Sequence, residues 1–238
     1  MEHFLADDGE KIYLKISGDG PPLVMLHGWT SNHQEWFPFI ADLQKHHTVY
    51  RWDARGHGGH RLQGNDQPTV SRMARDLHLL LKHFGLDDVC AVGHSMGALT
   101  LWQYVHDFGT TRLGKLCLID QSPRLVTDCD WPHGIYGDFD QTRAQRFVGE
   151  LELDFAESVL RLGALGLNER AREKYAENAR GWERSRAQLR ALDAKPLIAC
   201  WQSLTEADYR EVLSQIDIPA LLIYGGESNF YHASTAHY

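Results

Sequence analysis

The pattern Gly93-His94-Ser95-Met96-Gly97 constrains this chain most, because it stands between an apolar run and a helical one. Val89–Val92 has the pattern of a short buried strand, and the apolar spacing over Ala98–Phe108 is helical until Gly109 ends it. A strand, a tight turn and a helix therefore meet at Ser95. In such a turn the serine hydroxyl projects above the sheet, and glycines are needed on both sides because the two backbones pass too close for side chains. This context predicts a nucleophilic serine rather than an ordinary serine at a helix start.

Short apolar runs alternate with helical segments along the first half of the chain. Two alternating runs around Asp8 and Gly9 predict an N-terminal β-hairpin. A helix is expected to begin near Thr69 and to end at Gly85. Central parallel strands are predicted for five continuous apolar runs: Leu23–Leu26, Thr48–Trp52, Val89–Val92, Leu116–Ile119 and Ala220–Tyr224. The alternation predicts an α/β fold with a mostly parallel, doubly wound sheet and right-handed crossovers.

The alternation breaks after Asp120, and about a hundred residues pass before the next strand-like run begins at Ala220. Within this stretch an apolar stripe from Leu151 to Leu162 follows helical spacing, and the residues of Ala171–Leu192 favour helix. We therefore expect a helical cap inserted after the strand that ends at Asp120.

The cap divides the chain into three segments. We expect a first part of the core at residues 1–122, the helical cap at residues 123–214 and a second part of the core at residues 215–238. A cap placed after the carboxyl end of a strand covers that edge of the sheet and shapes a pocket there. Its aromatic residues are candidates either for the pocket wall or for the cap's own core: Trp131, Tyr136 and Phe139.

Composition and charge narrow the classes of function. At 238 residues and 43% hydrophobic content, the chain is long enough for one large domain with a full core. A formal charge of -8 disfavours nucleic-acid binding, because such proteins usually carry a basic surface. No stretch approaches the ~20 apolar residues of a membrane helix, and Met1–Glu10 lacks the pattern of a secretory signal. We expect a cytoplasmic protein that acts on a small molecule, and the sequence leaves its oligomeric state open.

The cysteines and histidines give no metal-binding pattern. The four cysteines have no paired spacing, and Cys90 and Cys117 fall within strand-like runs, as reduced buried thiols do. Two histidine pairs, His46 with His47 and His57 with His60, lack the nearby cysteines and the spacing of structural zinc sites. The sequence therefore predicts neither a metal nor a cofactor.

A nucleophilic serine needs a base, a carboxylate that orients the base, and donors for the developing oxyanion. The donors are the easiest to place. The segment His27-Gly28-Trp29 follows the strand Leu23–Leu26, so the backbone amide of Trp29 is expected beside that of Met96. These two N–H groups form the predicted oxyanion hole.

Taken in their order along the chain, these motifs resemble the α/β-hydrolase family. The resemblance runs from about Leu23 to the end of the chain, through the loop at His27, the turn Asp53–Gly58, the Ser95 turn, and Ile218-Pro219 before the last apolar run. It implies a mostly parallel sheet with a cap above it, and catalysis by a triad of serine, acid and histidine.

The acid departs from the commonest family pattern, in which an aspartate follows the strand after the cap. Here that place is Gly225–Asn229, so Ser228 or Asn229 stands where the aspartate is expected. Glu227 is a nearby carboxylate. Members that resemble capped dehalogenases place the acid at the end of the preceding strand instead. In this chain the run Leu116–Ile119 leads directly into Asp120, which is the predicted acid, and Glu227 remains the alternative.

The base is missing from its usual place. The family's chain order puts the histidine after one more strand and loop, but only fourteen residues follow Tyr224. A helix of ~11–12 residues and a strand of ~5–6 residues would exceed them, so neither His232 nor His237 occupies the expected position. His94 is expected to point away from the site. We therefore expect the triad histidine beyond Tyr238, in a longer form of the enzyme.

Two functions from different classes follow. The first is a serine hydrolase that cleaves a small carboxylic ester or thioester through an acyl-enzyme on Ser95, with acyl transfer, perhydrolysis and carbon–carbon hydrolysis as related reactions of the same fold. Aspartyl-type dehalogenase or epoxide hydrolase chemistry is disfavoured because position 95 is serine. The second is a non-catalytic member of the fold that binds a ligand or partner and lacks the triad histidine.

Overall fold

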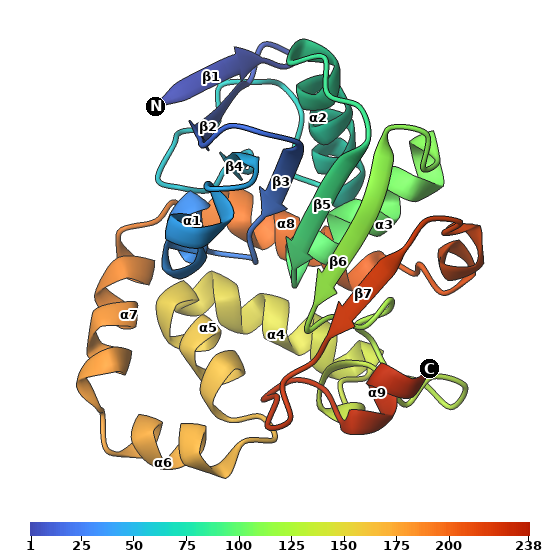
Figure 1. The fold of residues 1–238 in the computed structure, drawn as a ribbon. Coiled ribbons are helices and arrows are strands. Elements are labelled where there is room, and N and C mark those ends of the chain that lie inside the picture. Colours follow the sequence, from blue (N-terminus) through green and yellow to red (C-terminus); the bar gives the residue numbers. More distant parts are fainter.

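One seven-stranded sheet forms the centre of the computed structural model, which describes residues 1–238 (Figure 1). The strand order is β1-β2-β4-β3-β5-β6-β7, in which β3 to β7 pair in parallel and β1 and β2 form an antiparallel hairpin. The strands are β1 (Glu2–Leu5), β2 (Lys11–Ser17), β3 (Pro22–Leu26), β4 (Thr48–Asp53), β5 (Val89–His94), β6 (Leu113–Ile119) and β7 (Ala220–Ile223). The predicted mostly parallel α/β sheet is confirmed.

The helices lie on both faces of this sheet and beyond one of its edges, and none is both long and apolar enough to cross a lipid bilayer. The α-helices are α1 (Phe37–Leu43), α2 (Val70–His83), α3 (Met96–Phe108), α4 (Gln141–Leu153), α5 (Phe155–Ala164), α6 (Glu169–Ala176), α7 (Arg180–Arg190), α8 (Ala194–Glu206) and α9 (Ala233–His237). The 3-10 helices are η1 (His33–Trp36), η2 (Ile135–Gly137) and η3 (Glu211–Gln215).

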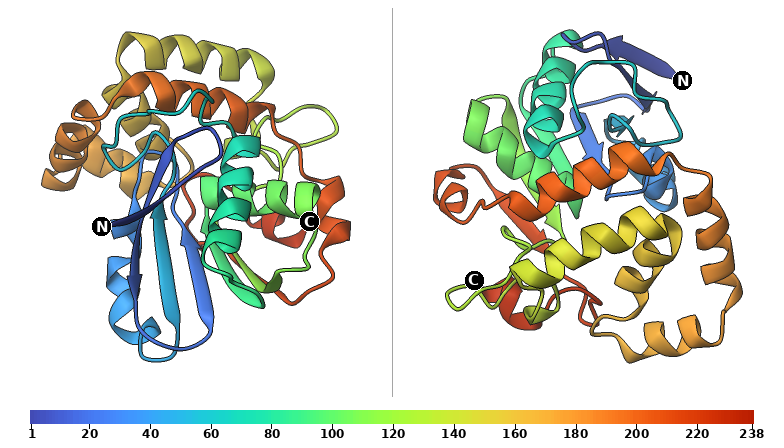
Figure 2. Two further views of the ribbon diagram at one scale, coloured as in Figure 1. Left: turned by 90° about the horizontal axis from the view of Figure 1, so that it is seen from above. Right: turned by 180° about the vertical axis from the view of Figure 1, so that it is seen from behind.

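The two faces of the sheet bury different cores. Helices α2 and α3 cover one face and α1 the other, as the view from above shows (Figure 2). Strand β3 contributes to both, because successive side chains of a strand point to opposite faces: Val24 and Leu26 belong to the large core, and Leu23 and Met25 to the small one. A continuous apolar run is therefore what a strand covered on both faces requires.

Helix α2 forms where the sequence predicts it. The Thr69 side chain caps the helix by accepting the Arg72 N–H at 3.1 Å, and Leu77 and Leu80 are fully buried on its apolar face. The chain leaves the helix through Gly85, whose φ of 62° is left-handed. The helix bounds of the prediction are thus confirmed by a cap and a stop of the expected kinds.

A buried ion network ties the N-terminal hairpin to α2. The guanidinium of Arg55, which is almost fully buried, donates to Asp76 on α2 at 2.5 and 2.7 Å and to Asp8 in the hairpin turn at 2.9 and 3.2 Å. Burial raises the pKa of the Asp76 carboxyl, and the hydrogen bonds from Arg55 hold the pKa of Asp8 far below its usual range. Removing one member of such a buried network leaves an unpaired charge, so the hairpin depends on all three.

The inserted helices α4–α7 lie beyond the carboxyl ends of the parallel strands (Figure 1). The apolar stripe predicted for Leu151–Leu162 is divided between α4 and α5, so the expectation of one continuous helical stripe was wrong there. Asp154 ends the first helix and caps the second by accepting the Glu157 N–H at 3.1 Å. This break turns Leu153 out into solvent, where it is 89% exposed.

Strand β7 also differs from the prediction. The run Ala220–Tyr224 was expected to form a central strand, but β7 pairs only with β6 and lies at the edge of the sheet. All four of its residues are exposed. An uninterrupted apolar run therefore gives neither the position of a strand in the sheet nor the burial of its side chains.

The crossing of β3, β5 and α3 has no room for side chains. A Cβ atom on Gly97 would lie far inside van der Waals contact with the carbonyl oxygen of Leu26, and one on Gly93 would lie 2.5 Å from the carbonyl group of Gly97. Both obstacles are backbone atoms, which no rotamer change can move. The steric requirement for glycine on both sides of the turn, predicted from the sequence, is met in the structure.

We expect Gly97→Ala to destabilise the protein by more than about 3 kcal/mol, because the added methyl group forces the β3 backbone away from α3. Gly149→Ala is the matched control: this glycine lies inside α4 with open space around it, and alanine there should stabilise by ~0.5–1 kcal/mol. Urea unfolding followed by circular dichroism measures both changes. Equal stabilities of the two variants would contradict the steric account.

Candidate active site

Ser95 occupies the tight turn between β5 and α3. Its backbone has φ 50° and ψ -115°, a conformation that costs a non-glycine residue ~1–3 kcal/mol. The surrounding backbone holds it there: the Ser95 N–H donates to the Ile119 carbonyl at 3.0 Å, and the Ser95 carbonyl accepts from Ala98 at 2.9 Å. The strained turn leaves the side chain half-buried at the wall of a cavity.

This cavity has a volume of about 220 Å³ and lies between the sheet and the inserted helices. Its wall includes the predicted nucleophile Ser95, the predicted acid Asp120 and the two predicted oxyanion donors, Trp29 and Met96. Its remaining wall is mostly apolar: Leu99, Leu125, Ile135, Val159, Leu162, Trp201, Leu204, Phe230 and Tyr231. Residues from distant parts of the chain, between Gly28 and Tyr231, therefore meet at the carboxyl edge of the sheet.

The two predicted oxyanion donors both have free N–H groups. Met96 is the first residue of α3, so its N–H has no acceptor within the helix, and the Trp29 N–H donates to no group of the protein. The Trp29 side chain is fixed separately, because its indole N–H donates to the Leu197 carbonyl at 2.9 Å and its ring packs on Trp201. Both residues line the cavity, and neither backbone N–H has an acceptor within the protein.

His27 shapes the loop that carries Trp29. Its ring is fully buried, where Nε2 accepts the Ala54 N–H at 3.1 Å and Nδ1 donates to the Gly28 carbonyl at 2.8 Å. Burial lowers the pKa of His27, which keeps the imidazole neutral and lets one nitrogen accept while the other donates. These two hydrogen bonds brace the loop, as expected of a loop-shaping residue at this position.

Asp120 follows β6 in a left-handed conformation, with φ 47°. Its Oδ2 accepts the Ser228 hydroxyl at 3.0 Å, and its N–H donates to the Ile223 carbonyl at 2.7 Å. The Ser228 oxygen also accepts the N–H groups of Phe230 and Tyr231, each at 3.2 Å. The other carboxylate oxygen, Oδ1, is buried without a hydrogen-bond partner. Asp120 is therefore anchored at one oxygen and free at the other.

The alternative acid and the C-terminal histidines lie elsewhere. Glu227 is exposed and does not line the cavity, although it directly precedes Ser228. The His232 Nε2 atom lies 3.0 Å from the Tyr136 carbonyl oxygen, and His237 is exposed on α9. None of these three side chains borders the space between Ser95 and Asp120.

His94 was expected to point away from the site, and this expectation was wrong. Its ring lines the cavity, with Nδ1 2.9 Å from Oε1 of Glu35, which also lines it. Burial alone would raise the pKa of Glu35, but the hydrogen bond from His94 holds it below its ordinary value. Burial would likewise lower the pKa of His94, and the bond to Glu35 raises it instead. Glu35 was not singled out in the sequence, because nothing local marks a partner 59 positions away.

The aromatic residues proposed for the pocket wall pack the interior of the inserted segment instead. Trp131, Tyr136 and Phe139 are all buried, but none lines the Ser95 cavity. Phe139 contacts the rings of Phe147 and Trp201, and Tyr136 donates to the Leu162 carbonyl. Of the two alternatives for these residues, the structure favours the core of the inserted segment.

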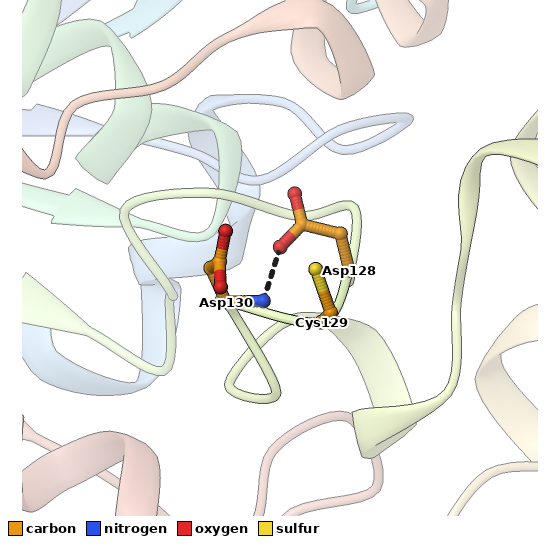
Figure 3. Close-up of side chains that lie close together, drawn as sticks. All are labelled: Asp128, Cys129 and Asp130. Carbon is orange, nitrogen blue, oxygen red and sulfur yellow. Dashed lines mark hydrogen bonds between the residues drawn. The ribbon is translucent and has the colours of Figure 1, made fainter.

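One group of possible metal ligands lies far from the cavity wall, in the exposed turn Asp128, Cys129 and Asp130 (Figure 3). The Asp130 N–H donates to Oδ1 of Asp128 at 2.9 Å, and Arg124 pairs with the other oxygen of Asp128 at 2.6 Å. All four cysteines of the chain are free thiols, and burial raises the pKa of Cys200 strongly.

Comparison with known proteins gives a consistent result. A family model described as the alpha/beta hydrolase fold matches residues 21–237. The chain is 28% identical over 232 residues to a non-heme haloperoxidase of Rhodococcus erythropolis, covering 95% of this chain and 82% of the relative. It is 29% identical over 213 residues to a pimeloyl-[acyl-carrier protein] methyl ester esterase of Aeromonas hydrophila, covering 87% and 77%. Among solved structures, an esterase from Exiguobacterium antarcticum shares the fold, with a TM-score of 0.84, 21% identity, and coverage of 99% and 84%.

We expect the imidazole of His94 to titrate above the ordinary histidine pKa of ~6.5, and Glu35→Gln to lower that pKa. A pKa raised by folding stabilises the protein below the ordinary value, and this contribution is lost as the pH rises through the raised value. Histidine NMR titration of both proteins measures the shift, with Glu10→Gln as the control. An unchanged His94 titration in Glu35→Gln would contradict the ion pair.

Proposed function

The chain belongs to the α/β-hydrolase family, and from that premise we propose that it is a serine hydrolase that cleaves a small carboxylic ester or thioester through an acyl-enzyme on Ser95. One observation carries the proposal: Ser95, the free N–H groups of Trp29 and Met96, and the half-anchored carboxylate of Asp120 all border one cavity. Relatives named as esterases, such as that of Aeromonas hydrophila, support ester hydrolysis in general.

The acylation step assigns a role to each group. The Ser95 hydroxyl oxygen attacks the substrate carbonyl carbon, while a base takes its proton and later delivers it to the leaving alcohol or thiol. The carbonyl oxygen becomes an oxyanion and accepts the N–H groups of Trp29 and Met96. Losing one such donor typically costs ~2.7–4 kcal/mol of transition-state stabilisation. Water then hydrolyses the acyl-enzyme by the same sequence in reverse.

Asp120 is the proposed acid of the triad. Ser228 holds one carboxylate oxygen, which leaves Oδ1 to accept the N–H of an imidazole placed between Asp120 and Ser95. His94 does not fill this place, because its Nδ1 is bonded to Glu35 and Oδ1 of Asp120 has no hydrogen-bond partner. The histidine that the family's chain order calls for would be the donor to Oδ1.

The cavity favours a small apolar substrate group. Its volume of about 220 Å³ is below the ~300–1,000 Å³ of pockets for drug-sized ligands, and most of its wall is aliphatic or aromatic. Val159 and Leu162 from α5 and Trp201 and Leu204 from α8 supply part of this wall. We propose on this ground that residues 123–214 act as the cap that sets substrate size.

We expect the protein to cleave p-nitrophenyl butyrate faster as imidazole is added, with saturation, because free imidazole enters the space between Ser95 and Asp120. Ser95→Ala should abolish this turnover and the labelling by a fluorophosphonate. Asp120→Asn should reduce the imidazole-dependent rate at least about tenfold, since the amide cannot orient and charge-stabilise the base in the same way.

Free imidazole itself cleaves activated esters, so every rate is compared with Ser95→Ala at the same imidazole concentration. Labelling that persists in Ser95→Ala would refute the nucleophile. Saturable ester binding without turnover or adduct in the unaltered protein would instead favour the second function, a binding module.

A further inference from the structure

Glu35 connects the two parts of the chain that carry the oxyanion donors. Its Oε1 lies 2.9 Å from Nδ1 of His94, and its Oε2 accepts the Gly28 N–H at 3.1 Å. Gly28 directly precedes Trp29, and His94 stands two residues before Met96. One carboxylate thus bridges the loop that presents the first donor and the turn that presents the second.

The bridge has a rigid support. Glu35 lies in η1, where its neighbour Trp36 is 3% exposed in the small core between the sheet and α1. On the other side, the backbone N–H of His33 donates to Oδ1 of Asp53 on β4 at 2.6 Å, and its Nδ1 lies 2.9 Å from the same oxygen. The backbone segment that carries Glu35 is therefore anchored to the sheet on both sides of this residue.

The loop and the turn that Glu35 joins are already in close contact. A Cβ atom on Gly28 would lie 3.1 Å from Nδ1 of His94 and 3.5 Å from the Ser95 Cβ atom. Because Gly28 has no side chain to keep the loop and the turn apart, the distance between them depends on the groups that connect them. The bridging carboxylate is the polar group that does so at the cavity wall.

We infer that Glu35 is a positioning residue that sets the spacing between the Trp29 and Met96 N–H groups, an inference that rests on the proposed function. A carboxylate suits this role because two donors converge on it: the Gly28 N–H lies 3.1 Å from Oε2 and 3.4 Å from Oε1, and His94 lies against Oε1. Glutamine has one acceptor oxygen and no charge, so in Glu35→Gln the Gly28 and His94 groups either share one neutral oxygen or one of them loses its acceptor. The charged and titratable groups that face the pair are Asp120, on the side of His94, and His27, on the side of Glu35.

An alkylboronic acid tests the spacing directly, without depending on the base. The Ser95 oxygen adds to the trigonal boron, the hydroxyl proton leaves to the buffer, and the anionic tetrahedral boronate places one of its hydroxyl oxygens where the ester oxyanion forms. Loss of a whole donor costs ~10²–10³ in rate, so a misplaced donor in Glu35→Gln should weaken boronate binding ~10- to 100-fold. Where turnover is measurable, kcat should fall in parallel while KM changes less than about threefold.

Glu10→Gln is the matched control. Glu10 is also a buried carboxylate that accepts two backbone N–H groups, from Gln63 at 2.6 Å and Gly64 at 2.5 Å, but it does not line the cavity. Its variant should bind the boronic acid within about twofold of the unaltered protein. His94→Phe removes the bridge from its other end, and the double variant with Glu35→Gln should bind no more weakly than either single variant.

The outcomes separate the two proposals. Equal boronate affinity of Ser95→Ala and the unaltered protein would refute the nucleophile and, with it, the role of Glu35. Loss of affinity in Ser95→Ala with full affinity in Glu35→Gln would refute the positioning role alone. Equal losses in Glu35→Gln and Glu10→Gln would also overturn it, because the effect would then be a general loss of stability. If Glu35→Gln does not fold, Glu35→Asp, which keeps the charge and shortens the reach, gives the same comparison.

Discussion

The contact between the Gly97 backbone and the carbonyl of Leu26 is the constraint on which the site depends. Leu26 ends β3, and the next three residues form the loop that presents the Trp29 N–H; Gly97 follows Met96 at the start of α3. The steric contact that excludes every side chain at position 97 therefore also brings the two predicted oxyanion donors to one cavity. A requirement of chain packing and a requirement of the proposed catalysis thus fall on the same few backbone atoms.

The carboxyl end of β6 shows how an acid can be held at an unusual place. Asp120 adopts a left-handed conformation that a non-glycine residue avoids, and it does so while its N–H is bonded to β7 and its Oδ2 to Ser228. Ser228 lies in the turn where the family usually has its aspartate. The serine thus stands in for that residue as a donor to an acid supplied by the neighbouring strand.

The sequence predicts best what depends on local sterics and periodicity. The glycines around Ser95, the hairpin at Gly9 and the caps of α2 follow from conformational rules that need no knowledge of distant residues. The pair of His94 and Glu35 does not, because it joins positions 59 apart through the tertiary fold.

Two further features were not determined by the sequence, for different reasons. It left open whether Trp131, Tyr136 and Phe139 line the pocket or pack a core, because an apolar side chain carries no mark of which cavity or core it enters. The break at Asp154 did have a local signal, since an aspartate three residues before Glu157 is typical of a helix start, yet the continuous apolar stripe on both sides obscured it.

The charges of the cavity follow from its tertiary pairing. The charges of Glu35 and His94 compensate each other, which leaves Asp120 as the cavity carboxylate without a cationic partner. An uncompensated carboxylate with a free buried oxygen favours a group that donates a proton and becomes positive during the reaction, as an imidazole does. The pairing of Glu35 with His94 thus leaves Asp120 unpaired for the role proposed for it, which is to orient a base.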